Sequence, residues 1–409
     1  MLNMKRLLTI LSIFLTLLLF IGCTREEPVQ VKNMKIEFNL PSNFKADIKY
    51  AGKDVVFTSQ YATYTFVTDN NGVLTIPEII PDEYTIYTSW EISGAQYKQM
   101  INSNELVEDK ATILLKATLA KYPLFTQKDI KMALDMLVMR SLLISKVYYS
   151  GTKDNSNRNY IVDSFVEIFN NSDEVVYADG KYLALAESVS PAAYLAKDNP
   201  EYIFTRQICR FPGNGSTYPI EPGKSIVIAA RNARDHRLSA STSVDLSNAD
   251  FEVKDTDGTG NPDVKALPVI SSSTTIKFFN LITGGPNAVF LFETDEDIMS
   301  WPEQFAPGKS AGERFRRVPV SVVLDGVEFL KNSSGTGPDL NLKRFQDIVD
   351  AGFAFINASS GYTNESLERK ISGVVDGRLM LRDSNNSTQD FVIISGPVPR
   401  NYENPLLFN

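Results

Sequence analysis

FVEIFN, at Phe165–Asn170, is a run whose successive side chains would alternate between the two faces of a β-strand. In that strand Val166 and Ile168 would face a core, whereas Glu167 would face outward. The run Pro222–Ala230 starts with Pro-Gly-Lys and continues as SIVIAA, which predicts a turn leading into a second strand. These two stretches predict a β-sheet with at least one buried face.

A third informative stretch lies near the C-terminus. Ser366–Arg369 reads SLER, and Asp383–Phe391 reads DSNNSTQDF. The paired asparagines in the second segment are turn residues, whose side-chain amides bond the local backbone. We expect Arg369 to form an ion pair or a loop clamp with Asp383 or Asp390.

In this order, the stretches Phe165–Asn170, Pro222–Ala229 and Ser366–Phe391 resemble the motifs of the lamin-tail family. That family has an immunoglobulin-like β-sandwich, found at the tail of nuclear lamins and in many bacterial secreted proteins. The resemblance implies an expanded sandwich over residues 142–409. Large inserts between strands would account for its length, mainly at about 194–215, 232–275 and 326–365.

The region 34–119 also has a β pattern. Lys35–Leu40 alternates polar and apolar residues, and Thr68–Gly72 contains the turn signal Asn-Asn-Gly. Together with Ile80–Tyr84, this turn resembles the transthyretin-like modules of carboxypeptidase-regulatory and collagen-adhesin B type, with Asp82 where glycine is usual. The resemblance implies a small sandwich whose core is filled by the tyrosine and which has no catalytic residue.

A different pattern occupies residues 120–141, which we expect to be a connector between the two sandwiches. Ile130, Leu134, Leu137 and Val138 recur at helical spacing with charged residues between them, which predicts a short helix or an irregular segment. The nearby methionines, Met132 among them, are expected to fill a core. The fold class predicted for the whole chain is therefore all-β, with two β-sandwiches.

The N-terminus has the features of an export signal. Lys5 and Arg6 precede an apolar or small-residue run, Leu7–Gly22, which is too short for a comfortable membrane span. The run ends at Cys23 and resembles a bacterial lipobox, in which a signal peptidase cuts before a cysteine that carries lipid. The resemblance implies a signal peptide at residues 1–22 and lipidation of Cys23.

Residues 23–33 are expected to form a polar tether. The charged run Thr24–Glu27 resembles the surface-export signal of Bacteroidetes lipoproteins. Several acyl chains hold a protein stably on a membrane, because each buried methylene contributes about 0.8 kcal/mol. We therefore expect an anchor in the outer membrane, and the sequence leaves open whether the protein faces the periplasm or the cell surface.

Composition excludes several classes of function. The formal net charge is −8 and becomes −10 once the signal with Lys5 and Arg6 is removed, so nucleic acid is not an expected partner. The chain has one histidine, His236, which excludes multi-histidine zinc centres. We expect His236 to be a solvated loop residue and Cys209, in a strand-like run, to be a buried and inert thiol.

One acidic loop could bind a cation. Asp255–Asp263 reads DTDGTGNPD, and spaced carboxylates on a glycine-rich loop can surround Ca²⁺. The loop resembles calcium loops of thrombospondin type-3 or dockerin style and implies Asp255, Asp257 and Asp263 as ligands. A solvated loop without an ion is the alternative interpretation.

The sequence offers no catalytic residue with a recognisable signature. The function that we expect is non-enzymatic binding or assembly by an outer-membrane lipoprotein, with a TonB-dependent transporter, a surface polysaccharide or another envelope protein as partner. A structural envelope spacer or a polysaccharide-binding lipoprotein is one alternative. The second alternative is a hydrolase whose acids have no motif, because such an enzyme needs only two carboxylates in a cleft.

Overall fold

The computed structural model describes residues 30–102, 107, 109, 111–126, 129–256, 258–332, 337–338, 342–375 and 377–408. The expected signal peptide at 1–22 and the lipidation residue Cys23 lie outside these described residues. The all-β class is confirmed, because 42% of the protein is strand and 8% is helix. Among the described residues, no helix is long and apolar enough to cross a membrane.

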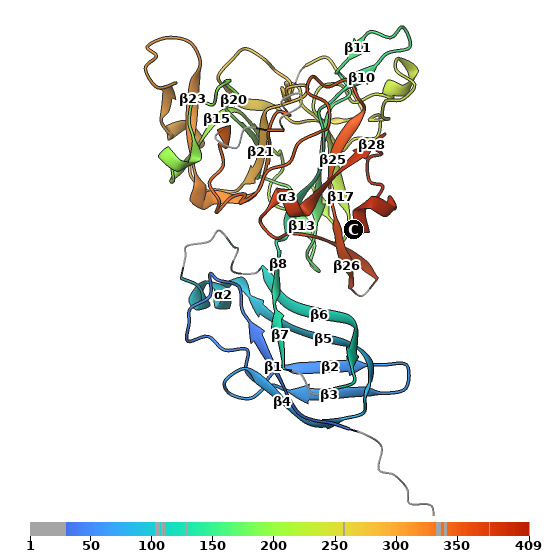
Figure 1. Ribbon diagram of the computed structural model, residues 1–409. Coiled ribbons are helices and arrows are strands. Elements are labelled where there is room, and N and C mark those ends of the chain that lie inside the picture. Colours follow the sequence, from blue (N-terminus) through green and yellow to red (C-terminus); the bar gives the residue numbers. More distant parts are fainter. Residues whose placement is uncertain are drawn as a thin grey trace, which may run out of the picture. The chain divides into compact units, whose positions relative to one another are not determined.

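The chain forms two compact units, coloured blue to cyan and green to red for most of their length in Figure 1. The smaller unit comprises residues up to Leu40, Lys49–Ser89 and Lys116–Leu134; the larger one comprises Pro41–Ile48, Trp90–Leu115 and Asp135–Asn409. The first elements are β1 (Val31–Asn39), β2 (Asp54–Thr58), β3 (Thr63–Val67), β4 (Val73–Ile79), β5 (Asp82–Ser93), α2 (Gly94–Met100), β6 (Thr112–Leu124), β7 (Ile130–Ala133) and β8 (Asp135–Met139).

These strands form two sheets, with the orders β4-β1-β7 and β3-β2-β5-β6-β8. β1 pairs antiparallel with β4 and parallel with β7. Because β1 begins at Val31, the last three residues of the expected tether at 23–33 are strand. The limits 34–119 and 142–409 given to the two sandwiches remain predictions.

The predicted Asn-Asn-Gly turn is present after β3. Gly72 has a φ of +78°, and a Cβ there would lie 2.8 Å from the backbone nitrogen of Tyr50. The Asp69 carboxylate accepts the backbone N–H groups of Asn71 and Val73, each at 2.9 Å. Only glycine combines this conformation with this close approach at no steric cost.

Tyr84 on β5 fills the core of the smaller unit as expected. Its ring is buried and contacts Phe57 and Tyr64 edge-on, with centroids 5.9 and 6.2 Å apart. Its hydroxyl donates to the carbonyl of Ile80 at 2.8 Å, so the one polar atom of the ring has a partner.

The helix considered for the connector is wrong. Strands β7 and β8 occupy residues 130–133 and 135–139, with Leu134 between them. Ile130, Met132 and Leu134 are buried, whereas the residues between them, Lys131 and Ala133, are exposed. This is the period of two of a strand, and apolar residues spaced by four satisfy it as well as they satisfy a helix.

The larger unit contains the remaining strands and short helices. They are β9 (Leu142–Tyr148), β10 (Thr152–Lys153), β11 (Asn159–Tyr160), β12 (Phe165–Asn170), β13 (Val176–Tyr177), β14 (Tyr182–Ala186), η1 (Ala196–Asp198), β15 (Tyr202–Arg210), β16 (Pro219–Ile220), β17 (Ser225–Ala229), η2 (His236–Leu238), β18 (Phe251–Glu252), β19 (Lys265–Ala266), β20 (Val269–Ser272), β21 (Asn287–Phe292), η3 (Ile298–Ser300), β22 (Glu303–Phe305), β23 (Arg314–Pro319), η4 (Val320–Val322), β24 (Val323–Phe329), β25 (Glu365–Arg369), β26 (Ile371–Val375), β27 (Arg378–Leu381), α3 (Ser387–Asp390), β28 (Phe391–Ser395) and η6 (Pro405–Phe408).

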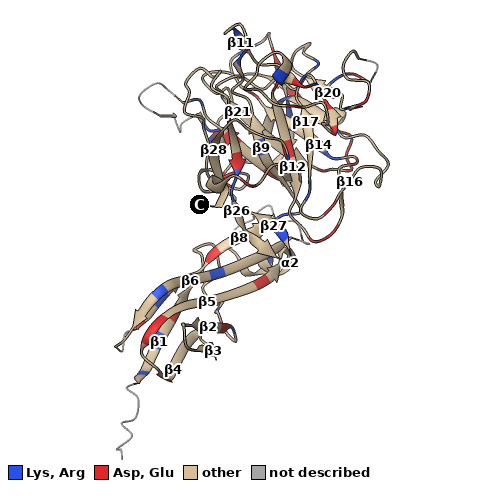
Figure 2. Cartoon of the chain, turned by 90° about the vertical axis from the view of Figure 1, so that its right-hand side faces the viewer, with Lys and Arg blue, Asp and Glu red and all other residues tan. Residues whose placement is uncertain are grey.

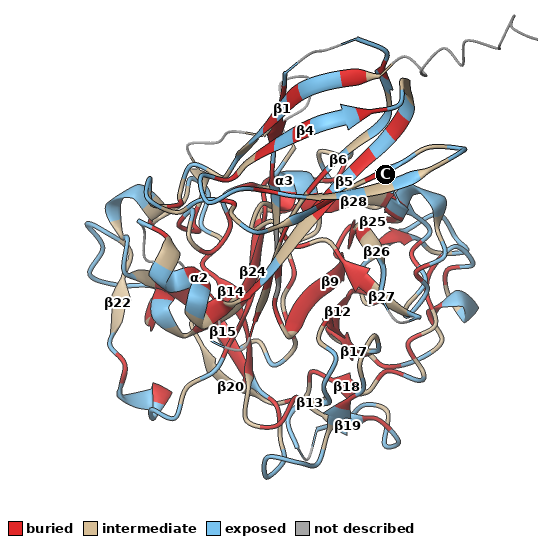
Figure 3. Ribbon diagram, turned by 90° about the horizontal axis from the view of Figure 1, so that it is seen from below, coloured by how far each residue is buried: buried red, intermediate tan, exposed pale blue. Residues whose placement is uncertain are grey.

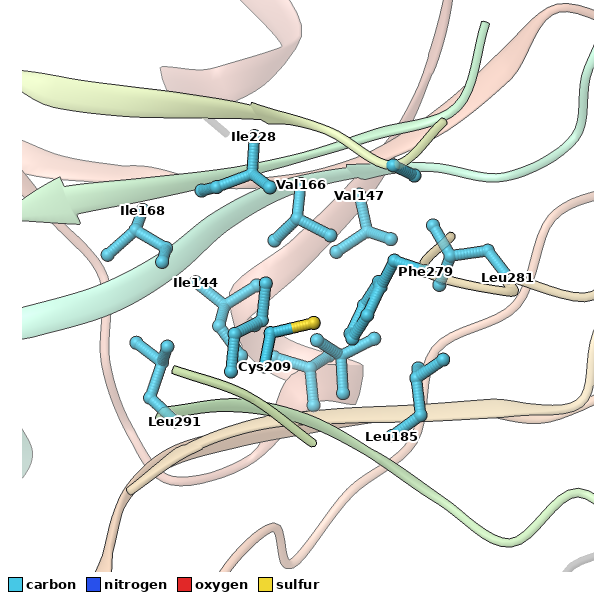
Figure 4. Close-up of a cluster of buried hydrophobic side chains, with 14 of the residues drawn as sticks. Ile144, Val147, Val166, Ile168, Leu185, Cys209, Ile228, Phe279, Leu281 and Leu291 are labelled. Carbon is cyan, nitrogen blue, oxygen red and sulfur yellow. The ribbon is translucent and has the colours of Figure 1, made fainter. Parts of the chain in front are cut away.

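Two large sheets pack face to face in this unit. The first has the order β19-β18-β17-β12-β9-β25-β28, and the second has the order β22-β23-β15-β14-β21-β24, with β20 also paired to β15. Their facing side chains form one core, in which Ile144, Val166 and Ile228 of the first sheet meet Leu185 and Cys209 of the second (Figure 4). Val166, Ile168, Ile226 and Ile228 therefore face the core, as the sequence pattern predicts.

The outer face of the first sheet is also covered, which corrects the prediction for Glu167. Every residue of β9 and β12 is buried (Figure 3). The covering side chains come from two clusters, one with Val244 and Leu246 and one with Leu381 and Leu407. Glu167 is completely buried beneath the C-terminal segment instead of facing solvent.

The prediction of inserts is also corrected in part. The segment 194–215 contains β15, which pairs with β14, β20 and β23 and is therefore a strand of the sandwich. Its middle, Thr205–Gln207, is polar and buried, which conceals the strand in the sequence. The segment 326–365 likewise begins inside β24.

Burial predicts an unreactive thiol at Cys209. The side chain is fully buried among apolar groups, and this burial raises the pKa of the thiol. We expect a maleimide to leave Cys209 unmodified in the folded protein and to modify it once guanidinium unfolds the chain, as mapped by peptide mass spectrometry. The Ser156→Cys variant is the control, because Ser156 is exposed and should react at once. Rapid reaction of Cys209 in the folded protein would contradict this packing.

Candidate functional site

Arg369 on β25 lies at the centre of a buried ion-pair cluster. Its Nη2 is 3.0 Å from Asp325 Oδ2, and its Nη1 is 3.4 Å from both Asp383 Oδ1 and Asp390 Oδ2. Arg140 adds a second cation, with Nη1 3.1 Å from Asp383 Oδ2. The predicted clamp between Arg369 and the two late aspartates is confirmed, and Asp325 and Arg140 are members that sequence reasoning missed.

The aspartates of this cluster also hold loops. Asp390 accepts the backbone N–H and the hydroxyl of Ser384, at 2.9 and 2.7 Å. Asp350 accepts the N–H groups of Ser387 and Gly352, each at 2.9 Å. The side chains fill the space between them and leave no room for a water molecule. The cluster is therefore a structural clamp with no place for a ligand.

A second buried cation holds the C-terminal segment 398–408. Lys146 on β9 is fully buried, and its Nζ lies 2.8 Å from Glu368 Oε2. The same ammonium donates to the backbone carbonyls of Val398, at 3.2 Å, and Asn401. Figure 2 shows charged positions, blue and red, on strands of this unit as well as in its loops. Burial raises the pKa of Glu368, and Lys146 opposes that effect.

Glu167 completes this second clamp. Its carboxylate accepts the hydroxyl of Tyr402 at 2.8 Å, the backbone N–H of Arg400 at 2.9 Å and the hydroxyl of Ser225 at 2.6 Å. The serine hydroxyl shares this carboxylate with two other donors, so the arrangement fixes the segment and does not resemble a nucleophile with a free base. Glu167 and Lys146 together fix the C-terminal segment to the outer face of the first sheet.

Between this segment and its neighbours lies an open groove, which we call the C-terminal groove. It consists of two adjoining hollows of about 670 and 510 Å³ that share Gly223, Lys224 and Leu379. The turn before β17, the β26–β27 hairpin and the C-terminal segment supply its walls. The lining residues are Asp173, Pro222, Gly223, Lys224, Ser225, Gly377, Arg378, Leu379, Arg400, Tyr402, Glu403 and Phe408.

Gly223 is required for the shape of the groove. Its φ is +70°, and a Cβ there would lie 2.6 Å from Cγ of Arg378. The Pro-Gly turn of the sequence motif therefore lets the arginine stem approach the backbone. Arg378 in turn donates from Nη1 to the carbonyl of Asn171 at 2.8 Å, which joins the hairpin to the end of β12.

The groove combines cations with apolar surface. Lys224 is exposed, and no described residue hydrogen-bonds or ion-pairs with its ammonium group. Arg400 is paired with Asp250, with Nη2 2.5 Å from Oδ2. Leu379 and Phe408 supply apolar contacts beside these cations. Such a lining can hold a carboxylate or another anionic group on a partly apolar body.

The predicted calcium loop gives a mixed result. The side chain of Asp255 is half exposed and lies 3.6 Å from Lys277 Nζ, and Asp263 is exposed. Asp257 lies outside the described residues. Within the described part of the chain, no group of three or more His, Cys, Asp or Glu side chains is arranged to hold a metal ion. Calcium at this loop stays a prediction.

The prediction for His236 is wrong. The side chain is fully buried at the start of η2. Its Nε2 lies 2.8 Å from the carbonyl of Asn232, so this nitrogen carries the hydrogen and Nδ1 accepts the hydroxyl of Tyr160 at 2.7 Å. Burial lowers the pKa of the imidazole. The polar residues around it in the sequence do not reveal this burial, because Tyr160 lies on β11, 76 residues earlier in the chain.

The comparisons with known proteins give a family without an assigned function. Residues 221–398 match the family described as "Protein of unknown function (DUF4876)". This matched region covers 178 of the 409 residues. It includes the 222–225 turn, the β26–β27 hairpin and Arg369, whereas the C-terminal wall of the groove lies beyond it.

One solved structure extends the likeness to almost the whole chain. It is the crystal structure of a DUF4876 family protein from Bacteroides thetaiotaomicron VPI-5482, with a TM-score of 0.58. The match covers 93% of this chain and 98% of that one at 21% sequence identity, so it shows a shared fold alone. No curated protein matches the chain.

The Arg369 cluster makes stability depend on pH. Burial raises the pKa of Asp390 from 3.8 to about 6, even though Arg369 favours the charged form. The folded state then holds the proton more tightly than the unfolded state, so stability falls as pH rises through this window. We expect the melting temperature of the larger unit to fall between pH 4 and 6. The Asp390→Asn variant should lose part of this slope, because burial also raises the pKa of Asp325 and Glu328, whereas an unchanged slope would contradict the assignment.

Removal of Lys146 tests the second clamp. The Lys146→Met variant leaves Glu368 buried without its cation, which costs about 3–5 kcal/mol in comparable sites. We expect a lower melting temperature and faster hydrogen exchange in residues 398–408, measured by mass spectrometry. The matched control is Lys224→Met, which removes an exposed lysine and should change neither quantity. Unchanged exchange in the first variant would show that the clamp does not hold the segment.

Proposed function

We propose that this chain is a lipid-anchored, non-enzymatic binding or assembly protein of the bacterial outer membrane. The observation that supports binding is the C-terminal groove, whose walls are fixed by buried contacts while Lys224 stays free at its surface. Rigid scaffolds that present a preformed concave surface are suited to recognition. The proposal is an inference from the groove, because a fold alone does not define a function.

The anchor is proposed from the N-terminal sequence. The run Leu7–Gly22 is followed by Cys23, and lipid on that cysteine would retain the chain at a membrane. The periplasmic face and the cell surface are both compatible with such an anchor. Within this proposal the polar residues after Cys23 act as the tether.

We also propose the two finer fold assignments. The Asn-Asn-Gly turn and the buried Tyr84 support a transthyretin-like smaller unit. The strand pair β12–β17 and the Arg369 contacts to Asp383 and Asp390 support a lamin-tail-like larger unit. Neither assignment carries a catalytic residue.

The groove favours a partner with acidic groups. Lys224, Arg378 and Arg400 line it together with Asp173 and Glu403. Arg400 is already paired with Asp250, whereas Lys224 has no ion-pair partner among the described residues. An acidic segment of an outer-membrane protein, such as a TonB-dependent transporter, would place carboxylates against these cations. A surface polysaccharide with acidic sugars has the same chemistry and is the second candidate partner. A spacer role predicts no partner for the groove.

An affinity pull-down from mildly solubilised membranes tests this proposal. We expect the full-length tagged chain to appear in the membrane fraction and to retain a stoichiometric envelope partner, identified by mass spectrometry. The Lys224→Glu variant should lose that partner because it reverses the free charge in the groove. The Lys197→Glu variant makes the same change at an exposed lysine of η1, outside the groove, and should retain it.

The other outcomes separate the alternatives. A chain found only in the soluble fraction would overturn the anchor. A membrane-bound chain that retains acidic glycan in a Lys224-dependent way would assign the polysaccharide. A chain that retains neither protein nor glycan would favour the envelope spacer and overturn a binding role. Turnover of a bound glycan would favour the hydrolase.

A further inference from the structure

Strand β3 is the terminal strand of its sheet in the smaller unit (Figure 1). It pairs with β2 on one side, in the register Val67 to Asp54 through Thr63 to Thr58. Its other side has no paired strand among the described residues. A free strand side of this kind can pair with another strand.

The hydrogen bonds show which backbone groups are free. Ser59 donates its N–H to Ala62, and Thr68 donates to Lys53, so residues 62, 64, 66 and 68 direct their backbone groups to β2. The alternate residues, Thr63, Thr65 and Val67, therefore direct their N–H and C=O groups away from the sheet.

The edge lacks the devices that usually prevent strand pairing. Residues 59–68, SQYATYTFVT, include no charged residue, no proline and no glycine. β3 is accordingly tan along its length in Figure 2. Three other terminal strands carry such a device, since β4 has Pro77 and Glu78, β7 has Lys131, and β22 has Glu303, whereas β28 (FVIIS) does not. Two large side chains at this edge are exposed, Tyr61 at 82% and Val67 at 57%.

The strand is also complementary to itself. In an antiparallel pair of two copies centred on Thr65, Thr63 of one copy lies opposite Val67 of the other, and Tyr64 lies opposite Phe66. The rings of Tyr64 and Phe66 are half-buried and stacked side by side, with centroids 6.2 Å apart, so a second copy would cover their free surfaces. Aromatic and β-branched cross-strand pairs stabilise sheets, and no like charges meet in this register.

We propose that β3 pairs with β3 of a second copy of this chain, which joins two five-stranded sheets around a two-fold axis. The interface is isologous, because each copy contributes the same strand. This interface uses neither the C-terminal groove nor the lipid anchor. Its test is therefore independent of the proposed function. A short strand pair buries little area, so dimers form at high local concentration.

Site-specific cross-linking tests the register in the full-length chain, with the unmodified chain as baseline. In the Thr65→Cys variant the two cysteines face each other across the axis, at about 5.5 Å between Cα atoms, which suits a disulfide. The Thr63→Cys variant alone places its cysteines about 14 Å apart, four residues along the strand, and should not link. A mixture of Thr63→Cys and Val67→Cys chains should give the mixed disulfide.

The outcomes are decisive in both directions. The proposal expects links from Thr65→Cys and from the mixture, and none from Thr63→Cys alone or from Thr118→Cys, an exposed threonine of the inner strand β6. It also expects Thr65→Lys to abolish the dimer in sedimentation experiments while Thr118→Lys retains it. Equal linking at all positions would indicate random collision and overturn the register. No link at Thr65→Cys in a chain with unchanged melting temperature would overturn the pairing.

Discussion

Arg369 lies fully buried on β25 with carboxylates of Asp325, Asp383 and Asp390 around its guanidinium. Its Nε also donates to the carbonyl of Ile144 on β9, so one side chain joins β25 to β9 and to three acidic segments of the chain. Such a cluster gains little net stability over an apolar core, because desolvation offsets most of the attraction. Its effect is on position, because each of the three aspartates must lie beside the guanidinium for its buried charge to be paired.

The second clamp uses the same physics on the opposite face of the sheet. Lys146 pairs with Glu368 and binds backbone carbonyls of the C-terminal segment, while Glu167 accepts donors from that segment. These contacts turn an otherwise irregular chain end into a fixed wall. The C-terminal groove therefore depends on buried charges that do not line it. Glu167 contacts the lining through Tyr402 and Arg400, which it holds by hydrogen bonds.

Local pattern was enough to predict the strands with one apolar face and the turn at Gly72, because alternation and positive φ are properties of neighbouring residues. It was also enough to pair Arg369 with Asp390. It failed wherever burial is decided by distant segments: Glu167 looks exposed until the C-terminal segment covers it, and His236 looks solvated until Tyr160 meets its ring. The helix considered for the connector failed because a spacing of four fits a strand equally well.

The same reasoning explains why the groove has no signature in the sequence. Its three walls come from a turn near residue 223, a hairpin near residue 378 and the C-terminal segment, and each reads as ordinary turn or loop sequence alone. Gly223 is the one residue of a sequence motif whose role in the groove can be named, because its missing Cβ lets the Arg378 side chain lie against the backbone. The second buried clamp thus positions the C-terminal segment that forms one wall of the groove. A change in the shape of the groove can therefore arise from a residue with no exposed atom, and Lys146 is the clearest example.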